Sequence, residues 1–271
     1  MKKSSIWFIS LICLLIAGYS HTGLAQPPSQ GLVLWLEADA GVIGYDPNLV
    51  TDPNNPTDGL TGPAEIGDFV GVWEDQSASA NDAWRKYGLP TLVNRVFPNG
   101  THPVVDFSGT DGFVLEDAAA LQLDRLSIYA VVQADQGAQA QIIMGNYSDP
   151  PAGYGVGMDD GTAGLVKWFT AGYPKTLTTA QAIDPNVPVI LTAVYRPKVG
   201  QFSKMVYFNG LPVAQAPEGG LNYNPTSMAT VGVLDWGRQF LTGQIAEILI
   251  YDTVDVQQQT DVQDYLSTKY G

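Results

Sequence analysis

Basic and sulfur-containing residues are scarce in this 271-residue chain. It has one cysteine and two histidines, and 13 lysines and arginines stand against 27 aspartates and glutamates, for a formal net charge of −14. One cysteine excludes a disulfide framework and any cysteine-rich zinc module. Nucleic acids and anionic membranes both require a basic protein face, so the acidic balance argues against them as partners.

The N-terminus holds the one long apolar run, and it predicts an export signal. Lys2 and Lys3 give a positive start, Ile6 to Ala17 is apolar, and Gly23-Leu24-Ala25 is a small-x-small cleavage site. The run is too short for a spanning helix. We expect residues 1–25 to be a signal peptide and residues 26–271 a single domain. The mature protein should be secreted, periplasmic or on the cell surface, without membrane insertion.

Signal cleavage would also narrow the available chemistry. It would remove Cys13 and leave His102 as the only histidine. A histidine-based metal site needs further imidazoles or a cysteine partner, and a cysteine nucleophile would be absent. The chain contains no Gly-x-Ser-x-Gly elbow, so a Ser-His-Asp triad has no recognisable nucleophile. Most enzyme classes are therefore disfavoured.

Many short runs of β-branched and aromatic residues between Gly, Pro, Asn and Asp predict an all-β antiparallel sandwich. Asn209-Gly210 predicts a type I′ hairpin turn, and the proline-rich segment Gly44 to Asp68 a long loop. The thirteen expected strands are Leu32–Glu37, Phe69–Glu74, Val104–Phe107, Phe113–Leu115, Leu126–Gln133, Gln141–Met144, Tyr154–Met158, Leu165–Phe169, Val189–Arg196, Met205–Phe208, Leu211–Gln215, Ala229–Val233 and Gly243–Tyr251.

One helix is expected, at the C-terminus. Asp255 is placed to cap it, and Gln258 stands at the third position, as in a capping box. A single apolar stripe follows at three- and four-residue steps, made of Val262, Tyr265, Leu266 and Tyr270. The stripe predicts a helix that packs on the surface of the sandwich.

Four segments carry a resemblance to a known family. They are GLVLWLEAD at 31–39, VWEDQS at 72–77 with NDA at 81–83, PVVDFSGTD at 103–111, and GQIAEILIYD at 243–252 before the C-terminal helix. Together they resemble the bacterial secreted laminin G-like modules of the concanavalin A-like lectin/glucanase superfamily. The resemblance implies a two-sheet jelly roll of about a dozen strands, a concave face that binds glycans, and calcium in some members. The chain departs from the family's Gly-Asn-Gly turn at Ala78-Ser79-Ala80, which predicts an ordinary turn there.

Acidic residues gather in the N-terminal third, where no Lys or Arg occurs between Ser4 and Trp84. Calcium prefers six to eight oxygen ligands from carboxylates, amides and carbonyls, which the loop at 52–59 supplies close together. The expected calcium ligands are Asp52, Asn54, Asp58, Asp75 and Asp82. The alternative is that these side chains form turns through hydrogen bonds.

Aromatic residues beside polar ones at strand ends are candidates for stacking on sugar rings. The expected ligand-binding residues are Trp84, Arg85, Tyr87, Trp168, Tyr173 and Trp236. No strand carries the Glu-x-Asp-x-x-Glu or Glu-x-Asp-x-Glu pattern of a superfamily glucanase, and Glu37-Ala38-Asp39 lacks the third carboxylate.

The expected function is therefore a non-catalytic carbohydrate-binding or adhesion module, assisted by calcium, with a glycan or another surface protein as partner. A glycoside hydrolase or polysaccharide lyase on the same fold is the first alternative. A structural protein-binding surface module is the second.

Overall fold

The computed structural model describes most of the chain after the expected signal peptide. The described residues are 26–52, 55–137, 139–148, 150–161, 164–170, 176–197, 203–217, 220–234 and 237–271. The expected signal peptide at 1–25 lies outside these ranges. No helix within them is long and apolar enough to cross a membrane.

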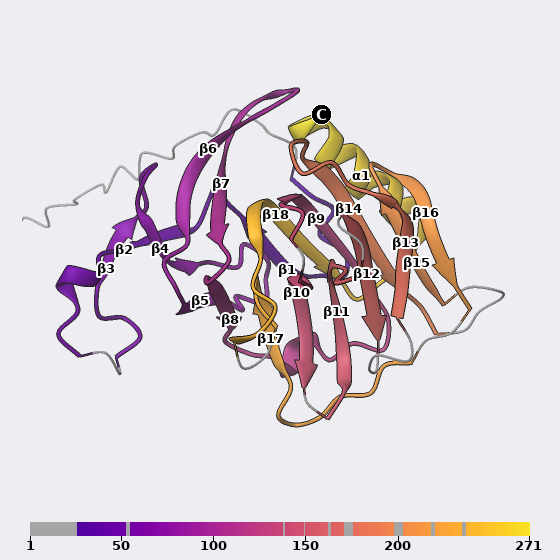
Figure 1. Cartoon of the computed structure of the whole chain (residues 1–271), viewed down its shortest axis with the longest axis horizontal. Coiled ribbons are helices and arrows are strands. Elements are labelled where there is room, and N and C mark those ends of the chain that lie inside the picture. Colours follow the sequence, from indigo (N-terminus) through magenta and orange to yellow (C-terminus); the bar gives the residue numbers. More distant parts are fainter. Residues whose placement is uncertain are drawn as a thin grey trace, which may run out of the picture.

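The strands form an antiparallel β-sandwich of the jelly-roll type (Figure 1). Along the first layer the order is β16 (Leu211–Ala216), β15 (Lys204–Phe208), β14 (Val189–Tyr195), β9 (Leu126–Ala134), β18 (Thr242–Tyr251), then β1 (Leu32–Glu37) and β7 (Gly100–Ser108), which share the far edge of β18, and β6 (Thr91–Phe97) beside β7.

The second layer is formed by the remaining strands. Its order is β13 (Thr176–Ala182), β12 (Leu165–Thr170), β11 (Ala152–Met158), β10 (Gln141–Ser148), β17 (Met228–Val231), β8 (Gly112–Leu115), β5 (Ala83–Tyr87), β4 (Phe69–Trp73), β2 (Val42–Tyr45) and β3 (Leu60–Pro63). A pairing of Phe69 with Thr91 links the layers at one edge. Short 3₁₀ turns occur at Pro47–Leu49 and Ala119–Leu121.

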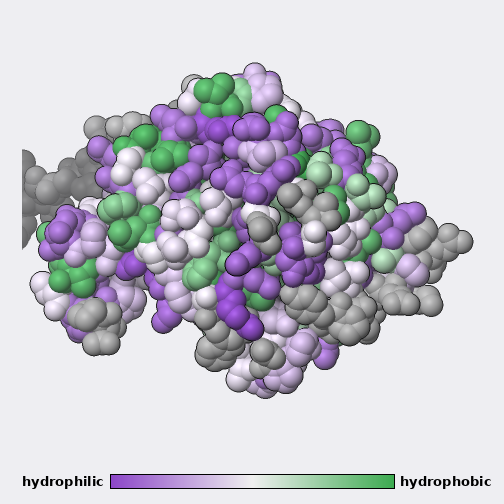
Figure 2. Space-filling model, in the orientation of Figure 1, coloured by the Kyte–Doolittle hydropathy of each residue, from purple (hydrophilic) through white to green (hydrophobic). Residues whose placement is uncertain are grey.

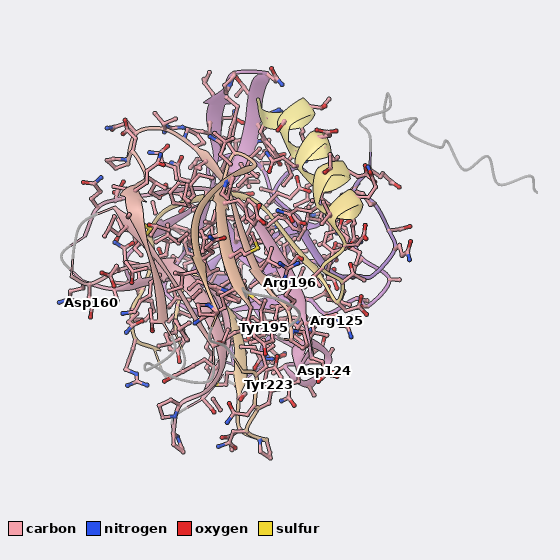
Figure 3. The ribbon with its side chains drawn as sticks, turned by 90° about the vertical axis from the view of Figure 1, so that its right-hand side faces the viewer. Asp124, Arg125, Asp160, Tyr195, Arg196 and Tyr223 are labelled. Carbon is pink, nitrogen blue, oxygen red and sulfur yellow. The ribbon has the colours of Figure 1, made fainter. Side chains whose placement is uncertain are left out.

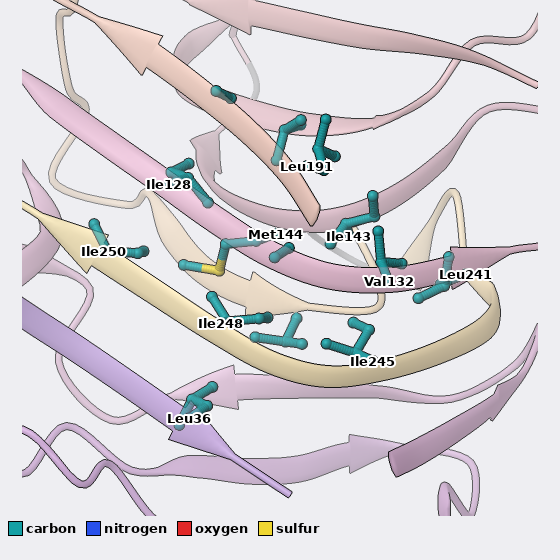
Figure 4. Packing of buried hydrophobic residues seen from close by; sticks show 14 of the residues in the cluster. Leu36, Ile128, Val132, Ile143, Met144, Leu191, Leu241, Ile245, Ile248 and Ile250 are labelled. Carbon is teal, nitrogen blue, oxygen red and sulfur yellow. The ribbon is translucent and has the colours of Figure 1, made fainter. Parts of the chain in front are cut away.

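The core lies between the layers and is built from alternate residues of the strands. Ile128 of β9 and Ile248 of β18 face Ile143 and Met144 of β10 across it (Figure 4). All four side chains are almost completely buried. Since side chains of a strand alternate between faces, the remaining residues of β9 and β18 project from the outer face of the first layer.

Helix α1 (Val256–Tyr270) covers part of that outer face, and the predicted stripe is its buried side. The Asp255 carboxylate accepts a hydrogen bond from the Gln258 backbone N–H at 3.0 Å, as its capping role predicted. At the other end the Asn99 side chain, on the tip of the β6–β7 hairpin, donates to the carbonyls of Ser267 and Thr268 at 3.0 and 2.9 Å. Both helix ends are thus tied by side chains.

Each of the thirteen expected strands overlaps an observed strand, although three extend one or two residues too far. Asn209 and Gly210 have φ of 50° and 77°, as the type I′ turn requires. The segment Gly44 to Asp68 is not a simple loop. It contains β3, which pairs with β2 in an arm that projects from one end of the sandwich (Figure 1). The sequence analysis also left β2, β5, β6 and β13 unassigned, because β2 is short and polar residues hide the alternation in the other three.

The turn at Ala78-Ser79-Ala80 is not the ordinary turn that the sequence predicted, because Ala80 adopts φ of 48°. A non-glycine residue in this region costs roughly 1–2 kcal/mol. We expect Ala80→Gly to raise the free energy of unfolding by up to about 1 kcal/mol, since relief of strain exceeds the added chain entropy of glycine. Urea denaturation measures this, with Ala78→Gly as the control that should not stabilise.

Candidate functional site

Polar side chains form a ladder on the outer face of the first layer, beside the area that α1 covers. Asp106 of β7, Gln244 of β18 and Gln133 of β9 lie next to one another in register. All three are half-buried, and the neighbouring residues on each strand belong to the core. Ser108 pairs with Thr242 one row nearer the strand ends, and the Asp135 N–H donates to the Thr242 carbonyl at 2.8 Å. We call the six residues Asp106, Ser108, Gln133, Asp135, Thr242 and Gln244 the polar trough.

The face that carries the trough is curved. Arg95 of β6 donates from Nη2 to the carbonyl of Asn186, just before β14, at 2.8 Å. In a flat sheet β6 and β14 would lie about 19 Å apart, because β7, β18 and β9 intervene at ~4.8 Å per step. No arginine side chain spans that distance. The β6–β7 hairpin must therefore bend across the face, as its arch in Figure 1 shows.

A groove opens where the trough reaches the strand ends. It has a volume of about 610 Å³ and is formed by the loops β7–β8, β9–β10 and β17–β18. We call it the loop groove, and its lining is Gly109, Gly137, Gln139, Ala140, Gln141, Gly237, Arg238, Gln239, Phe240 and Thr242. Because Thr242 belongs to both, the loop groove and the polar trough are continuous.

Backbone hydrogen bonds fix the loop that contributes most of this lining. Leu234 and Arg238 exchange two of them, at 2.7 and 3.3 Å, and the Ile142 N–H donates to the Gln239 carbonyl at 2.9 Å. Gln239 itself has φ of 53°, an uncommon conformation for a non-glycine residue. Gln141 is buried beneath the groove, where its side-chain amide binds the Asp135 carbonyl and the Thr242 N–H.

One of the expected ligand-binding residues borders this groove. Tyr87 packs edge-on against Phe240, with ring centroids 5.5 Å apart, and lies against Gly237. Arg85 instead stacks on Tyr45 at the base of the projecting arm, 3.8 Å from the ring centroid, and also donates to the Gly88 carbonyl. Trp84 is half-buried on β5.

The sequence analysis expected Trp168 at a strand end, and this prediction was wrong. It is in the middle of β12 with 0% of its surface exposed, and its indole N–H donates to the Val194 carbonyl at 3.3 Å. An indole with no exposed face has no surface on which a sugar ring could stack. The other two expected residues, Tyr173 and Trp236, lie outside the described residues.

Of the expected calcium ligands in the arm, Asp58 accepts hydrogen bonds from the chain's own donors. Asp58 Oδ2 accepts from the Thr51 N–H and hydroxyl at 2.7 and 2.9 Å and from the Asp52 N–H. The hydrogen bond from the Asp52 N–H, followed by those from the Thr51 N–H and hydroxyl, holds the pKa of the Asp58 carboxyl below its usual value. Asn54 lies outside the described residues.

The second set of expected calcium ligands is engaged in the same way. Asp75 accepts through Oδ1 from the N–H groups of Trp35 and Ser77, and through Oδ2 from the Ser77 hydroxyl and the Asn81 N–H. Asp82 accepts from the Asp75 N–H at 2.9 Å. Each of these hydrogen bonds occupies a lone pair on a carboxylate oxygen that a bound cation would need. Within the described part of the chain, no group of three or more His, Cys, Asp or Glu is arranged to hold a metal.

These hydrogen bonds favour the alternative in which the acidic side chains form turns, and calcium binding itself is untested. Since the carboxylates are already engaged, we expect millimolar calcium to leave the melting temperature unchanged relative to the same ionic strength of sodium chloride. A calcium-specific rise that chelator reverses would instead establish the site.

A second polar cluster lies buried beneath α1. Glu247 is fully buried and accepts from Trp35 Nε1, from the hydroxyls of Tyr265 and Tyr270, each at 2.8 Å, and from Lys269 Nζ at 3.0 Å. A bulge in β18 after Ile245 turns Glu247 toward the helix.

Lys269 also pairs with Glu37, and with Asp39 at 3.2 Å, which in turn contacts His102 Nδ1 at 3.1 Å. Burial alone would lower the pKa of Lys269, but the carboxylates of Glu247, Glu37 and Asp39 outweigh it and raise that pKa. The Glu37-Ala38-Asp39 segment is thus part of the anchor of α1. His102 lies on β7.

A third group lies at the other end of β9 (Figure 3). Tyr223 donates from its hydroxyl to the Leu123 carbonyl at 2.8 Å and accepts from the Leu123 N–H at 3.0 Å. Burial, and then the nearby Asp124 carboxylate, raise the pKa of Tyr195. The hydrogen bonds between Tyr223 and Leu123 stabilise the turn that precedes β9.

Sequence reasoning missed the ladder and the glutamines of the groove. Gln133 and Gln244 lie in strands of opposite direction far apart in the chain, and only strand register brings them together. The signal available in the sequence was the polar residue within each otherwise apolar strand.

A family model described as the concanavalin A-like lectin/glucanases superfamily matches residues 107–259. No curated protein sequence matches the chain.

Several solved structures have a similar fold. Domain 4 of AbnA, a GH43 extracellular arabinanase from Geobacillus stearothermophilus in complex with arabinotriose, is 15% identical, with 74% of this chain and 99% of that chain covered and a TM-score of 0.52. Trypanosoma rangeli sialidase in complex with sialic acid is 15% identical, with 90% and 34% covered and a TM-score of 0.53. The binding domain of Paraclostridial Mosquitocidal Protein 1 is 10% identical, with 88% and 52% covered and a TM-score of 0.52. This chain spans only about a third of the sialidase, and at these identities the likeness shows the fold alone.

Proposed function

Because the chain belongs to the concanavalin A-like lectin/glucanases superfamily, we propose that it binds carbohydrate without cleaving it, in the loop groove. The observation that carries this proposal is the loop groove of about 610 Å³, whose lining combines exposed polar side chains with Phe240. The arabinanase domain solved with arabinotriose has a similar fold, which supports a carbohydrate ligand.

The chemistry of the lining suits a ligand rich in hydroxyl groups. Side-chain amides both donate and accept hydrogen bonds, so the exposed Gln139 of the groove lining can meet a hydroxyl in either role. Phe240 and Tyr87 add an aromatic edge to the groove, and Arg238 adds a cation with fixed donors. A few polar groups beside an apolar surface are typical of small-ligand sites.

The hydrolase alternative requires two carboxyl groups about 5–9.5 Å apart on either side of the bond to be cut. The trough contains Asp106 and Asp135. Asp135 lies two strands away from Asp106 and two residues further along its strand, so their Cα atoms are roughly 12 Å apart. The Asp106 carboxylate also accepts from Gln244 Nε2 at 2.8 Å. We therefore do not propose Asp106 and Asp135 as the catalytic acid and nucleophile.

The protein-binding alternative would favour a broad apolar surface. On the face shown in Figure 2 the hydrophobic side chains occur in separate small groups. The strongly exposed ones in the described part of the chain, which include Leu49, Val96 and Leu211, come from different ends of the structure.

We also propose that the protein acts outside the cytoplasm, as its N-terminal segment predicts.

Glycan-array screening followed by titration calorimetry tests the proposal. We expect a subset of oligosaccharides to bind, with no release of product over the same period. Arg238→Ala and Gln139→Ala, both in the groove lining, should each weaken binding about 10-fold or more, because each removes hydrogen bonds worth roughly 1.4 kcal/mol or more. Gln215→Ala on β16 and Arg125→Ala, both exposed and distant in the fold, are matched controls that should change nothing. Failure of every glycan to bind would overturn the proposal, and product release would favour the hydrolase.

A further inference from the structure

The chain contains two Asn-Gly steps, and each lies at the exposed tip of a hairpin. Asn99-Gly100 closes the β6–β7 hairpin, and Asn209-Gly210 closes the β15–β16 hairpin. Asparagine is a chemically labile residue. It is most labile before glycine, because glycine has no side chain to hinder attack of its backbone nitrogen on the asparagine side chain. Both hairpin tips therefore expose a step that can lose ammonia.

The two asparagine side chains make opposite kinds of contact. Asn99 uses its nitrogen, since Nδ2 donates to the carbonyls of Ser267 and Thr268 in the last turn of α1 at 3.0 and 2.9 Å. Asn209 uses its oxygen, since Oδ1 accepts from the Ile190 N–H at 2.9 Å. An ionised aspartate keeps its acceptor oxygens but has no N–H to donate. Conversion to aspartate therefore breaks the contacts of Asn99 and preserves that of Asn209.

A carboxylate at position 99 would also face the negative end of a helix. The last carbonyls of a helix carry partial negative charge, so an anion beside them is destabilising. The β6–β7 tip and the end of α1 lie side by side in Figure 1. A Cβ atom on Gly271 would lie 2.6 Å from Pro98 Cβ, so the two elements are in direct contact. The added charge would thus oppose the docking of the tip on α1.

We propose that Asn99-Gly100 is a site of spontaneous modification that releases the C-terminal end of α1. The Gly100 backbone nitrogen gives its proton to water and attacks Asn99 Cγ, and the new C–N bond closes a succinimide ring. The bond from Cγ to Nδ2 breaks, and Nδ2 takes up a proton and leaves as ammonia. Water then opens the ring at either carbonyl and leaves aspartate or isoaspartate at position 99. Neither product has the two N–H donors that held the helix.

The docked helix slows this reaction in the folded protein. Nδ2 is the leaving group, and its two hydrogen bonds hold it on α1. Gly100 lies in the closing pair of the hairpin, opposite Phe97, which restrains the attacking nitrogen. The tip must therefore separate from the helix before Cγ can be attacked. Because the donors are lost with the ammonia, each conversion is irreversible, and released helix ends accumulate as the protein ages.

Mass spectrometry of the aged protein measures the conversion at each step. The protein is incubated for several weeks in mildly alkaline buffer, both folded and unfolded in guanidinium chloride, and then digested. The peptide with Asn99 should gain the mass difference between an amide and an acid in both samples, about 10-fold more slowly in the folded one. Absence of conversion at Asn99 in the folded sample, or equal rates in the two samples, would overturn the proposal.

Two substitutions test the structural consequence without waiting for the reaction. Asn99→Asp should lower the Tm by at least about 2 °C, because two hydrogen bonds are lost and a charge faces the helix end. Asn209→Asp adds the same charge at the other Asn-Gly step and is the matched control. It should stay within about 1 °C of the unaltered protein, since aspartate tolerates the φ of 50° there.

Hydrogen exchange locates the effect in the fold. Asn99→Asp should speed exchange in the last turn of α1, at residues 267–271, and leave the first turn unchanged, whereas Asn209→Asp should alter neither. Circular dichroism shows that both variants are folded. Unchanged exchange in the last turn of Asn99→Asp, or the same loss of Tm in both variants, would overturn the proposed release.

Discussion

Lys269→Met should lower the free energy of unfolding by about 3–5 kcal/mol, because it leaves buried carboxylates without their cation. Glu247 is 1% exposed, and Lys269, itself 4% exposed, is the cation that bonds to it. Glu37 and Asp39 lose the same partner. The hydroxyls of Tyr265 and Tyr270 remain as donors to Glu247, but neither carries a charge.

Urea denaturation followed by circular dichroism measures this loss. Lys86→Met on the exposed part of β5 is the matched control and should change stability by no more than about 0.5 kcal/mol. A loss below about 1 kcal/mol for Lys269→Met would show that Glu247 is protonated or hydrated in the folded protein. Glycan affinity of the folded fraction should stay unchanged, since the cluster lies beneath α1 and shares no residue with the loop groove.

The same cluster predicts how stability depends on pH. The folded-state pKa of Lys269 is raised, so its contribution is fully present below the unfolded-state pKa of about 10.4. It is lost as the pH rises through the higher folded-state pKa. The unaltered protein should therefore lose stability in alkaline solution more steeply than Lys269→Met.

Trp168→Ala should lower the free energy of unfolding by about 3–5 kcal/mol, the range for removing a buried aromatic side chain. The indole has 0% exposure and lies beside Tyr154, with ring centroids 6.1 Å apart. Its removal leaves a cavity between the layers and frees the Val194 carbonyl of its side-chain donor.

This variant also separates the two roles considered for Trp168. If the indole stacked on a sugar, Trp168→Ala would abolish binding and leave stability nearly intact. The burial predicts the reverse, with large destabilisation and unchanged affinity of the molecules that remain folded at low temperature. Trp168→Phe should recover part of the stability, because the phenyl ring refills most of the cavity.

The sequence predicted the strands that are rich in apolar residues, whether one face or both faces are buried. The run Leu32–Glu37 and the C-terminal run Gly243–Tyr251 both appear at their observed places. The strands that were missed are short or polar, as in Thr176–Ala182 at an edge of the sandwich, whose residues are mostly exposed. An edge strand has little apolar surface to bury, so its composition resembles that of a loop.

Candidate binding residues were harder to predict because exposure depends on the fold. Trp168 and Tyr87 look alike in the sequence, each an aromatic residue beside a cation. The register of β12 buries the first, and the approach of the β17–β18 loop places the second beside a groove. Likewise Asp75 is one acid among many in the sequence, yet four donors converge on it in the fold.

By itself the sequence determined the fold class, the family, the C-terminal helix with its buried stripe, and the exclusion of cysteine and polyhistidine chemistry. These follow from local periodicity and from counts, which need no knowledge of distant contacts. Tertiary structure alone decided that Gln133 and Gln244 lie side by side, that Lys269 pairs with Glu37 and Glu247, and that Arg95 bonds to the Asn186 carbonyl. Each of those contacts joins residues far apart in the chain, and only the register and curvature of the sheet bring them within bonding distance.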